Sequence, residues 1–180
     1  MRMLSGGDEG AFAELVRRHQ QTIMDYLCRL LRDRGTSEDL AQEVFLRVFR
    51  HRDRYSEHAS FRTWCYAIAT NLARDEIRSL RKRPAALGEE AMAGVADRGE
   101  APSEAPQREE MRRAVTLALE RIPEHFREVL ALRDLQGCSY EEISDVLRLE
   151  LGTVKSRINR ARVAFKESFL MTSLGNEVAL

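Results

Sequence analysis

The sequence predicts an all-α protein, made of two small helical domains that a flexible acidic linker joins. Apolar residues recur at helical spacing in both halves of the chain, and no run of alternating apolar and polar residues indicates a strand. The segment between the halves is rich in Ala, Gly, Glu and Pro and has no sustained apolar period, which is typical of a linker. We therefore place the domains at residues 1–84 and 109–170, the linker at 85–108 and a tail at 171–180.

The charges of the chain cancel overall but are unevenly distributed, with 29 Lys and Arg side chains against 29 Asp and Glu. Residues 1–85 carry 16 basic and 12 acidic side chains, residues 86–110 carry 2 and 7, and residues 111–180 carry 11 and 10. The negative excess therefore belongs to the linker. A net charge of zero is compatible with local basic surfaces that bind nucleic acid.

Composition and spacing argue against several classes of protein. No stretch approaches the roughly 18 apolar residues of a membrane span, and no apolar run follows the N-terminus as in a secretory signal, so we expect a cytoplasmic protein. The three cysteines, 37 and 73 residues apart, fit neither a disulfide framework nor a zinc site. The histidines show no metal-binding spacing, and the chain has neither a phosphate-binding glycine loop nor a nucleophile elbow. We expect no enzymatic activity, no bound metal and no cofactor.

Three helices are predicted in the first domain. Residues 10–32 keep a helical apolar period and form one amphipathic helix or two in tandem. Gly35 should end this helix, and Thr36 or Ser37 should cap the next, which runs over residues 38–51.

The helix over residues 38–51 should have two distinct faces. Its core face consists of Leu40, Ala41, Val44, Phe45 and Val48. Its second face consists of Asp39, Gln42, Glu43, Leu46 and Arg50. The third helix, over residues 60–83, ends in basic residues before Pro84, and its buried side should consist of Phe61, Trp64, Cys65, Ile68 and Leu72.

Four helices are predicted in the second domain. The first covers residues 109–121 and should direct inward Val115, Leu117, Ala118 and Ile122. The second begins with Pro123 in its first turn and runs to about residue 135, and Gly137 stops it. Ser139 and Glu142 have the spacing of a capping box, which starts a short third helix. The last helix follows Gly152 and Thr153.

The capped short helix, the turn and the last helix are the parts of a helix-turn-helix. Residues 153–166 carry five basic side chains and no acidic one. The residues expected to pack inward are Val154, Ile158, Ala161 and Phe165. Those left to face outward are Lys155, Ser156, Asn159, Arg160 and Arg162, whose types bind base edges and phosphates.

These motifs resemble a known family. Residues 39–49 (DLAQEVFLRVF), 61–64 (FRTW), 68–71 (IATN) and 75–78 (DEIR) resemble region 2 of bacterial sigma-70 factors. Residues 139–143 (SYEEI) and 152–157 (GTVKSR) resemble region 4 of the same family. No region 1.1 precedes the first module and no folded region 3 fits into the linker, so the layout is similar to the extracytoplasmic-function (ECF) subgroup. The turn departs from the family at Arg148, where Gly is common, and at Glu150.

The resemblance implies three sets of site residues. Those expected to bind core RNA polymerase are Asp39, Gln42, Glu43 and Leu46. Those expected to hold the minus-10 element as an unpaired strand are Asn71, Arg74, Asp75, Arg78, Arg81 and Lys82, with residues 55–61 as the wall of a base pocket. Those expected to bind the minus-35 duplex are Thr153, Lys155, Ser156, Arg157, Asn159 and Arg160.

The resemblance also implies partners. They are core RNA polymerase, bound through its beta-prime clamp helices and its beta flap, promoter DNA, and an anti-sigma factor that is either soluble or anchored in a membrane. The chain itself is not expected to insert into the membrane, and catalysis is left to the polymerase.

Two other interpretations remain open from the residues. One treats the polar face over residues 38–51 and the basic face of the last helix as ordinary solvated surfaces. The other treats the chain as a helix-turn-helix regulator that acts without docking on polymerase. Such a regulator has no reason to expose Leu46 among polar residues, and this arrangement is typical of an interface.

Overall fold

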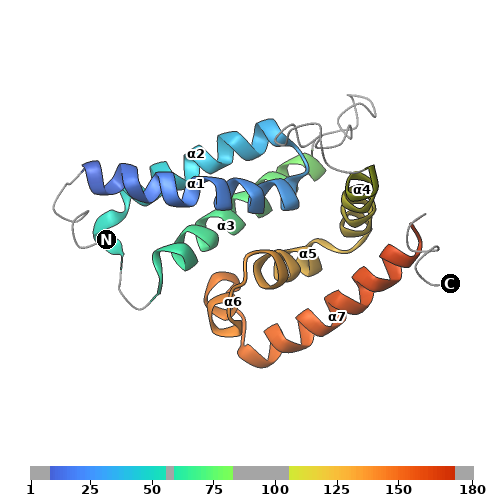
Figure 1. Cartoon of the computed structure of the whole chain (residues 1–180). Coiled ribbons are helices and arrows are strands. Elements are labelled where there is room, and N and C mark those ends of the chain that lie inside the picture. The colour runs from blue at the N-terminus through green and yellow to red at the C-terminus, as the bar shows by residue number, and fades with distance from the viewer. Residues whose placement is uncertain (1–8, 56–58, 83–105, 173–180) are drawn as a thin grey trace.

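The computed structural model describes residues 9–55, 59–82 and 106–172, and their regular structure is entirely helical (Figure 1). The first domain contains α1 (Glu9–Leu31), α2 (Arg34–Arg50), the 3-10 turn η1 (Arg52–Arg54) and α3 (Phe61–Lys82). The second contains α4 (Pro106–Arg121), α5 (Glu124–Leu130), the π-helical turn η3 (Ala131–Leu135), α6 (Tyr140–Leu147) and α7 (Leu151–Leu170). The predicted all-α class is confirmed. Most of the predicted linker and tail, and residues 56–58 of the predicted base-pocket wall, lie outside the described residues.

The first domain is a bundle in which α1, α2 and α3 pack against one another. Apolar residues three or four positions apart give each helix one buried side. The most deeply buried side chains include Ile23, Tyr26, Leu27, Val44, Val48 and Cys65. The segment predicted over residues 10–32 is one helix, Glu9–Leu31, rather than two in tandem.

The junction between α1 and α2 differs from the prediction. Arg32, not Gly35, has a left-handed backbone, with φ of 61°. Asp33 is the N-cap of α2, and its carboxylate accepts a hydrogen bond from the backbone N–H of Thr36 at 2.6 Å. Gly35 consequently lies inside the first turn of α2. Capping by Thr36 or Ser37 was therefore wrong, because the helix begins earlier, at Arg34, and Asp33 caps it by accepting from the third helical amide.

The buried side of α3 is broader than predicted. Phe61, Cys65 and Leu72 are buried as expected, but Trp64 and Ile68 are only half-buried. Tyr66 is completely buried although the sequence did not place it in the core. This happens because α3 packs on one side against α1 and α2 and on another against α6.

The helix-turn-helix of the second domain follows the prediction closely. Gly137 has φ of 66°, and Ser139 and Glu142 form both hydrogen bonds of a capping box at the start of α6. Arg148 ends α6 in the left-handed region, with φ of 54°. The last helix, α7, begins at Leu151, so Gly152 belongs to its first turn rather than to the connection.

Several details of the second domain differ from the prediction. Leu117 on α4 is 46% exposed instead of buried, while Ala114 and Ala118 supply the inward face. Pro123 is the N-cap of α5 rather than a residue of its first turn, and the helix turns π-helical after Leu130. In addition, α4 begins at Pro106, three residues before the predicted start of its domain.

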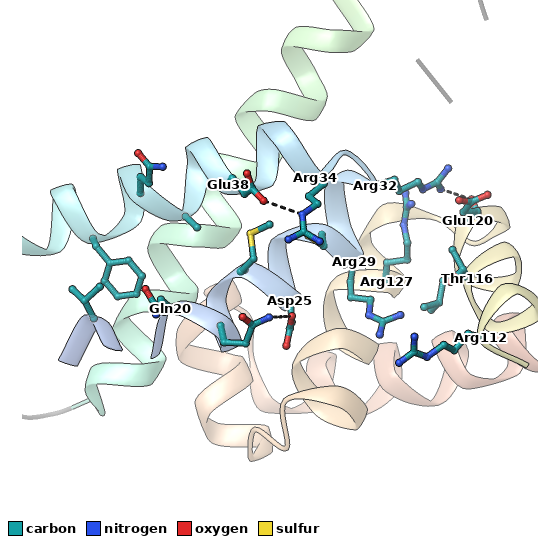
Figure 2. A pocket seen from close by; sticks show the side chains of 18 of the residues that line it. Gln20, Asp25, Arg29, Arg32, Arg34, Glu38, Arg112, Thr116, Glu120 and Arg127 are labelled. Atoms are coloured by element: carbon teal, nitrogen blue, oxygen red, sulfur yellow. Dashed lines mark hydrogen bonds and ion pairs between the residues drawn. The ribbon is translucent and has the colours of Figure 1, made fainter. Parts of the chain in front are cut away.

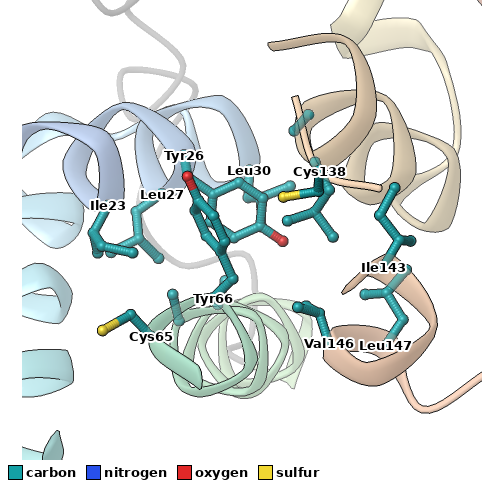
Figure 3. Close-up of a cluster of buried hydrophobic side chains, with 14 of the residues drawn as sticks. Ile23, Tyr26, Leu27, Leu30, Cys65, Tyr66, Cys138, Ile143, Val146 and Leu147 are labelled. Carbon is teal, nitrogen blue, oxygen red and sulfur yellow. The ribbon is translucent and has the colours of Figure 1, made fainter. Parts of the chain in front are cut away.

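The two domains share one hydrophobic core in this structure (Figure 3). Tyr66 of α3 and Tyr26 of α1 stack edge to face, with ring centroids 5.2 Å apart. On the side of the second domain, α6 contributes Ile143, Val146 and Leu147 to the same cluster. The sequence predicted the two helical bodies but not that they pack together. None of the helices in the described ranges is long and apolar enough to cross a membrane.

Candidate polymerase and nucleic-acid interfaces

The exposed face of α2 carries the four residues predicted to bind polymerase. Their spacing of three or four residues places Asp39, Gln42, Glu43 and Leu46 on one side of the helix. Leu46 is 50% exposed, Asp39 and Gln42 are exposed, and Glu43 is half-buried. Arg47 donates to Glu43 at 2.7 Å, and this hydrogen bond holds the pKa of the Glu43 carboxyl below its usual value. The face is therefore an apolar anchor surrounded by polar groups.

A groove of about 1170 Å³ runs from this face to the second domain (Figure 2). Gln42 and Leu46 line its wall on α2, and Leu117 lines it on α4. Its remaining apolar lining includes Phe12, Val16, Met24, Phe45 and Leu119. Sequence reasoning missed the groove because its walls come from both sides of the linker. The sequence carried no signal for the groove, since Leu117, which lines its α4 wall, was expected to face inward.

One end of the groove is cationic, as Figure 2 shows. It is lined there by Arg29, Arg32, Arg112 and Arg127, which come from α1, the turn after it, α4 and α5. The Nη2 of Arg32 donates to the backbone oxygen of Glu120 at 2.6 Å. Burial lowers the pKa of Arg127 to about 10, and its Nε and Nη1 find no hydrogen-bond partner among the described residues. A partner carboxylate would be favoured at this end, because it would compensate a partly buried charge.

The residues predicted for the minus-10 element divide into two groups on α3. Four of them face solvent, namely Asn71, Asp75, Arg78 and Lys82. Within this group the Nη1 of Arg78 lies 3.2 Å from a carboxylate oxygen of Asp75. An ion pair between two exposed side chains is weak, so Arg78 and Asp75 both remain available for contacts with a nucleic acid.

The other two residues, Arg74 and Arg81, contact the second domain, Arg74 from a half-buried position and Arg81 with 70% of its side chain exposed. Arg74 donates to both carboxylate oxygens of Glu128, at 2.6 and 2.7 Å, and these hydrogen bonds raise its pKa. Arg81 donates to Glu124 at 3.0 Å. Both carboxylates lie on α5, so Arg74 is held against the protein itself, while Arg81 makes one contact there and keeps most of its side chain in solvent.

The outward face of α7 carries the residues predicted for the minus-35 element. Val154, Ile158 and Ala161 are completely buried and Phe165 is half-buried, so the helix presents its other side to solvent. The exposed residues of that side are Lys155, Ser156, Asn159 and Arg160, and the half-buried ones are Thr153 and Arg157. The geometry brings all six together on one helix, as the reading of a groove by a single helix requires.

Arg162, which was expected to face outward, does so but is not free. It pairs with Asp134 of η3, and hydrogen bonding to this carboxylate raises the pKa of Arg162. The sequence gives no signal for this pairing, since the two residues lie 28 positions apart.

No group of three or more His, Cys, Asp or Glu side chains suited to a metal ion occurs within residues 9–55, 59–82 and 106–172. The three cysteines are unpaired, and burial raises the pKa of Cys65 to about 12 and that of Cys138 to about 11. Thiols so far from ionisation are poor nucleophiles and poor metal ligands.

Comparisons with known proteins agree with the two-domain organisation. Residues 15–83 match the family model of Sigma-70 region 2, and residues 112–165 match that of Sigma-70, region 4. The chain is 32% identical over 177 residues to the ECF RNA polymerase sigma factor SigW of Bacillus subtilis, covering 93% of each chain.

Two solved structures have the same fold. CnrH, in complex with the cytosolic domain of CnrY, is 25% identical with a TM-score of 0.69 and covers 92% of each chain. The sigma factor RpoE, in complex with the anti-sigma factor NepR from Bartonella quintana, is 18% identical with a TM-score of 0.68, covering 89% of this chain and 98% of that one. On the strength of the sequence relationship, this chain belongs to the sigma-70 family and is an ECF-type RNA polymerase sigma factor.

Proposed function

We propose that the chain binds core RNA polymerase and directs it to specific promoters, while the polymerase performs the nucleotidyl chemistry. The observation that carries this proposal is the ordered match to regions 2 and 4 together with the exposed face of α2. Asp39, Gln42, Glu43 and Leu46 dock on the beta-prime clamp helices, with Leu46 as the apolar anchor. The second domain reaches the beta flap. Residues 1–84 and 109–170 are the functional modules, and the second extends back to Pro106, where α4 begins.

For the minus-10 element we assign the role of strand capture to α3. Asn71, Asp75, Arg78 and Lys82 are exposed and supply amide, carboxylate and cationic groups along one edge of the helix. Exposed base edges and a phosphate backbone are bound by such groups. Arg74 and Arg81 join them once the second domain has moved away.

For the minus-35 element we assign base contacts to Lys155, Ser156, Asn159 and Arg160, because these polar side chains are exposed in the N-terminal half of α7. Thr153 and Arg157 lie at the margin of this face and bind phosphate. The two elements are thus bound by different domains. The distance between the minus-10 and minus-35 elements on the DNA matches the distance between the two domains only when polymerase holds both domains.

An anti-sigma factor that occupies the groove between α2 and α4 completes the proposal. Support comes from the relatives of the same fold, one of which is bound to an anti-sigma factor. Since Gln42 and Leu46 line the groove, a helix lying in it would cover part of the polymerase-binding face. Its apolar side would contact Met24 and Leu117, and an acidic side chain would reach the arginines around Arg127. Such an inhibitor is soluble or membrane-anchored, and the chain itself acts in the cytoplasm.

Run-off transcription with core polymerase across genomic fragments tests the function. A subset of fragments should give full-length transcripts only when the chain is added. If initiation is no better with the chain than without it on any fragment, the assignment of promoter direction is wrong. The docking residues are tested separately below.

A further inference from the structure

Four arginines lie at the cationic end of the groove, and they come from both sides of the linker. Arg29 lies on α1 and Arg32 directly after it, while Arg112 lies on α4 and Arg127 on α5 (Figure 2). These side chains repel one another, and repulsion from Arg32 contributes, after burial, to the lowered pKa of Arg127. Cations that a fold holds together against their own repulsion are typical of a site that binds an anion.

The carboxylates of the groove compensate this charge only in part. Two further arginines that line it are each paired with a carboxylate of the same lining, namely Arg34 with Glu38 at 2.9 Å and Arg113 with Glu109 at 3.0 Å. The carboxylates that remain in the described lining are Asp25 and Glu120. Against the four arginines they leave an excess of two positive charges.

The guanidinium of Arg127 lacks a full counter-charge. Its Nε and Nη1 are buried and find no hydrogen-bond acceptor among the described residues. Burial lowers its pKa to about 10, and the acidic groups that raise this pKa, Glu124 and Glu120, do not offset the burial. Since a buried charge without a counter-ion destabilises a folded protein, an anion bound beside Arg127 would stabilise the chain.

The number and the chemistry of these groups match a phosphate dianion better than a carboxylate. A phosphomonoester carries a charge of about −1.5 to −2 at pH 7, close to the excess in the groove. One guanidinium satisfies both oxygens of a carboxylate, whereas the three oxygens of a phosphomonoester accept from several donors. Thr116 lies one helical turn after Arg112 on the side of α4 that lines the groove, so its hydroxyl can serve as a neutral donor.

We propose that the cationic end of the groove is a binding site for a phosphate dianion. The groups that hold it are those of Arg29, Arg112, Arg127 and Thr116. Leu119 follows on the same side of α4, so an apolar group attached to the phosphate has a wall to contact. A soluble phosphomonoester and a phospholipid headgroup present the same chemical group, and the experiment below separates these two sources. Binding at this site requires neither polymerase nor promoter DNA, so the proposal goes beyond the proposed function and does not depend on it.

Isothermal titration calorimetry on the free, full-length chain tests the site, with inorganic phosphate as the first probe and NaCl added to keep the ionic strength constant. Wild type should bind one equivalent of phosphate. Arg127→Gln should weaken this binding by about tenfold or more, because it removes a hydrogen bond between two charged groups. Arg29→Gln should have an effect of the same order. The exposed position of Arg29 makes it the second test variant in case Arg127→Gln does not fold.

The matched control is Arg17→Gln, which removes the same charge from an exposed position of α1 outside the lining of the groove. This control should bind phosphate as wild type does. Circular dichroism establishes that each variant is folded. Thermal unfolding is a second readout, since phosphate should raise the melting temperature of wild type and of the control more than that of the two test variants.

Two further probes identify the source of the phosphate. Adenosine monophosphate presents a soluble phosphomonoester, and vesicles of phosphatidylcholine with phosphatidic acid present the same group at a lipid surface. Calorimetry with the nucleotide and flotation with the vesicles, each repeated with Arg29→Gln, show which form the arginines bind. Vesicles of pure phosphatidylcholine are the control for flotation. Binding of either form that Arg29→Gln weakens supports the site.

Three results would overturn the proposal. If wild type binds none of the three phosphate probes, the cluster is not a phosphate site. If Arg17→Gln weakens binding as much as the two test variants do, only the overall charge attracts the anion. If the dicarboxylate succinate binds as tightly as phosphate, the site does not select phosphate. Run-off transcription is a separate measurement, so a failed promoter assignment leaves the phosphate site standing, and a failed phosphate site leaves the promoter assignment standing.

Discussion

The hydroxyl of Tyr26 lies 2.8 Å from Oγ1 of Thr70, so α1 and α3 are joined by a hydrogen bond between two completely buried side chains. Oγ1 of Thr70 donates its own proton to the backbone oxygen of Tyr66 at 2.7 Å. Tyr26 must therefore be the donor to Thr70. Burial raises the pKa of Tyr26, which keeps the hydroxyl protonated.

Tyr26→Phe should lower the free energy of unfolding by about 0.5–1.5 kcal/mol, because it leaves a buried acceptor without a donor. Urea denaturation followed by circular dichroism measures this change. Tyr140→Phe is the control, since this half-buried ring keeps its contact with Arg133. An equal decrease in the free energy of unfolding in the two variants would contradict the stabilising role of the Tyr26 hydroxyl.

Removing the cap of α2 should be destabilising. Asp33→Ala should cost about 1 kcal/mol at neutral pH, because the Thr36 amide loses its acceptor. Asp33→Asn retains an acceptor and should cost less. Chemical denaturation of wild type and the two variants gives the order of their stabilities. An equal loss of stability in both variants would argue against the hydrogen bond.

The same cap should contribute to stability in a pH-dependent way. Hydrogen bonding to Thr36 holds the pKa of the Asp33 carboxyl below its usual value. A carboxyl with a lowered folded pKa stabilises above its unfolded pKa, about 3.9, and loses this contribution as the pH falls through the folded value. The difference in the free energy of unfolding between wild type and Asp33→Ala should therefore be largest at pH 7 and should shrink in strong acid. A gap independent of pH would exclude the carboxylate charge as its source.

Two glycines should respond to alanine with opposite signs. Gly137 has φ of 66°, and a Cβ there would meet nothing within 4 Å, so Gly137→Ala isolates backbone strain and should cost about 1 kcal/mol. Gly152 lies in α7, also with open space around it, so Gly152→Ala should stabilise by up to about 1 kcal/mol. Thermal unfolding measures the melting temperature of each variant. Shifts of the melting temperature in the same direction would contradict the assigned backbone geometry.

The docking face on α2 is tested by Gln42→Ala combined with Glu43→Ala. Association with core polymerase should be abolished while the helical circular dichroism is unchanged, because both side chains point away from the core. Glu14→Ala is the matched control, since Glu14 forms a comparable ion pair with Arg18 on α1. An unaltered association constant in the double variant would reject this face.

Base contact by α7 is tested by Arg160→Ala. Binding to a minus-35 duplex should weaken by about 1–3 kcal/mol and lose its preference at one base pair. Arg157→Ala, at the margin of the face, should weaken binding equally for all sequences. If Arg160→Ala also acts uniformly across sequences, its contact is with phosphate.

The extent to which the sequence predicts this protein can be judged from particular elements. Local rules sufficed at the capping box of Ser139 and Glu142 and at the left-handed Gly137, where every group involved lies within a few residues. They failed at the start of α2, because the helix already begins at Arg34 with Asp33 as its cap, so the amides that Ser37 was expected to cap lie inside the helix. Helical periodicity placed Val154 and Ile158 in the core, but it gave Leu117 a buried position that belongs to Ala114.

The amino-acid sequence by itself determined the helical class, the family and which faces of α2 and α7 are exposed, since these follow from periodicity and short motifs. Only the tertiary structure decided that the domains pack together, that the groove forms between them and that Arg74 meets Glu128. These features join residues 54 or more positions apart or come from both sides of the linker. No local pattern encodes such pairings, because they depend on how two separately folded surfaces fit.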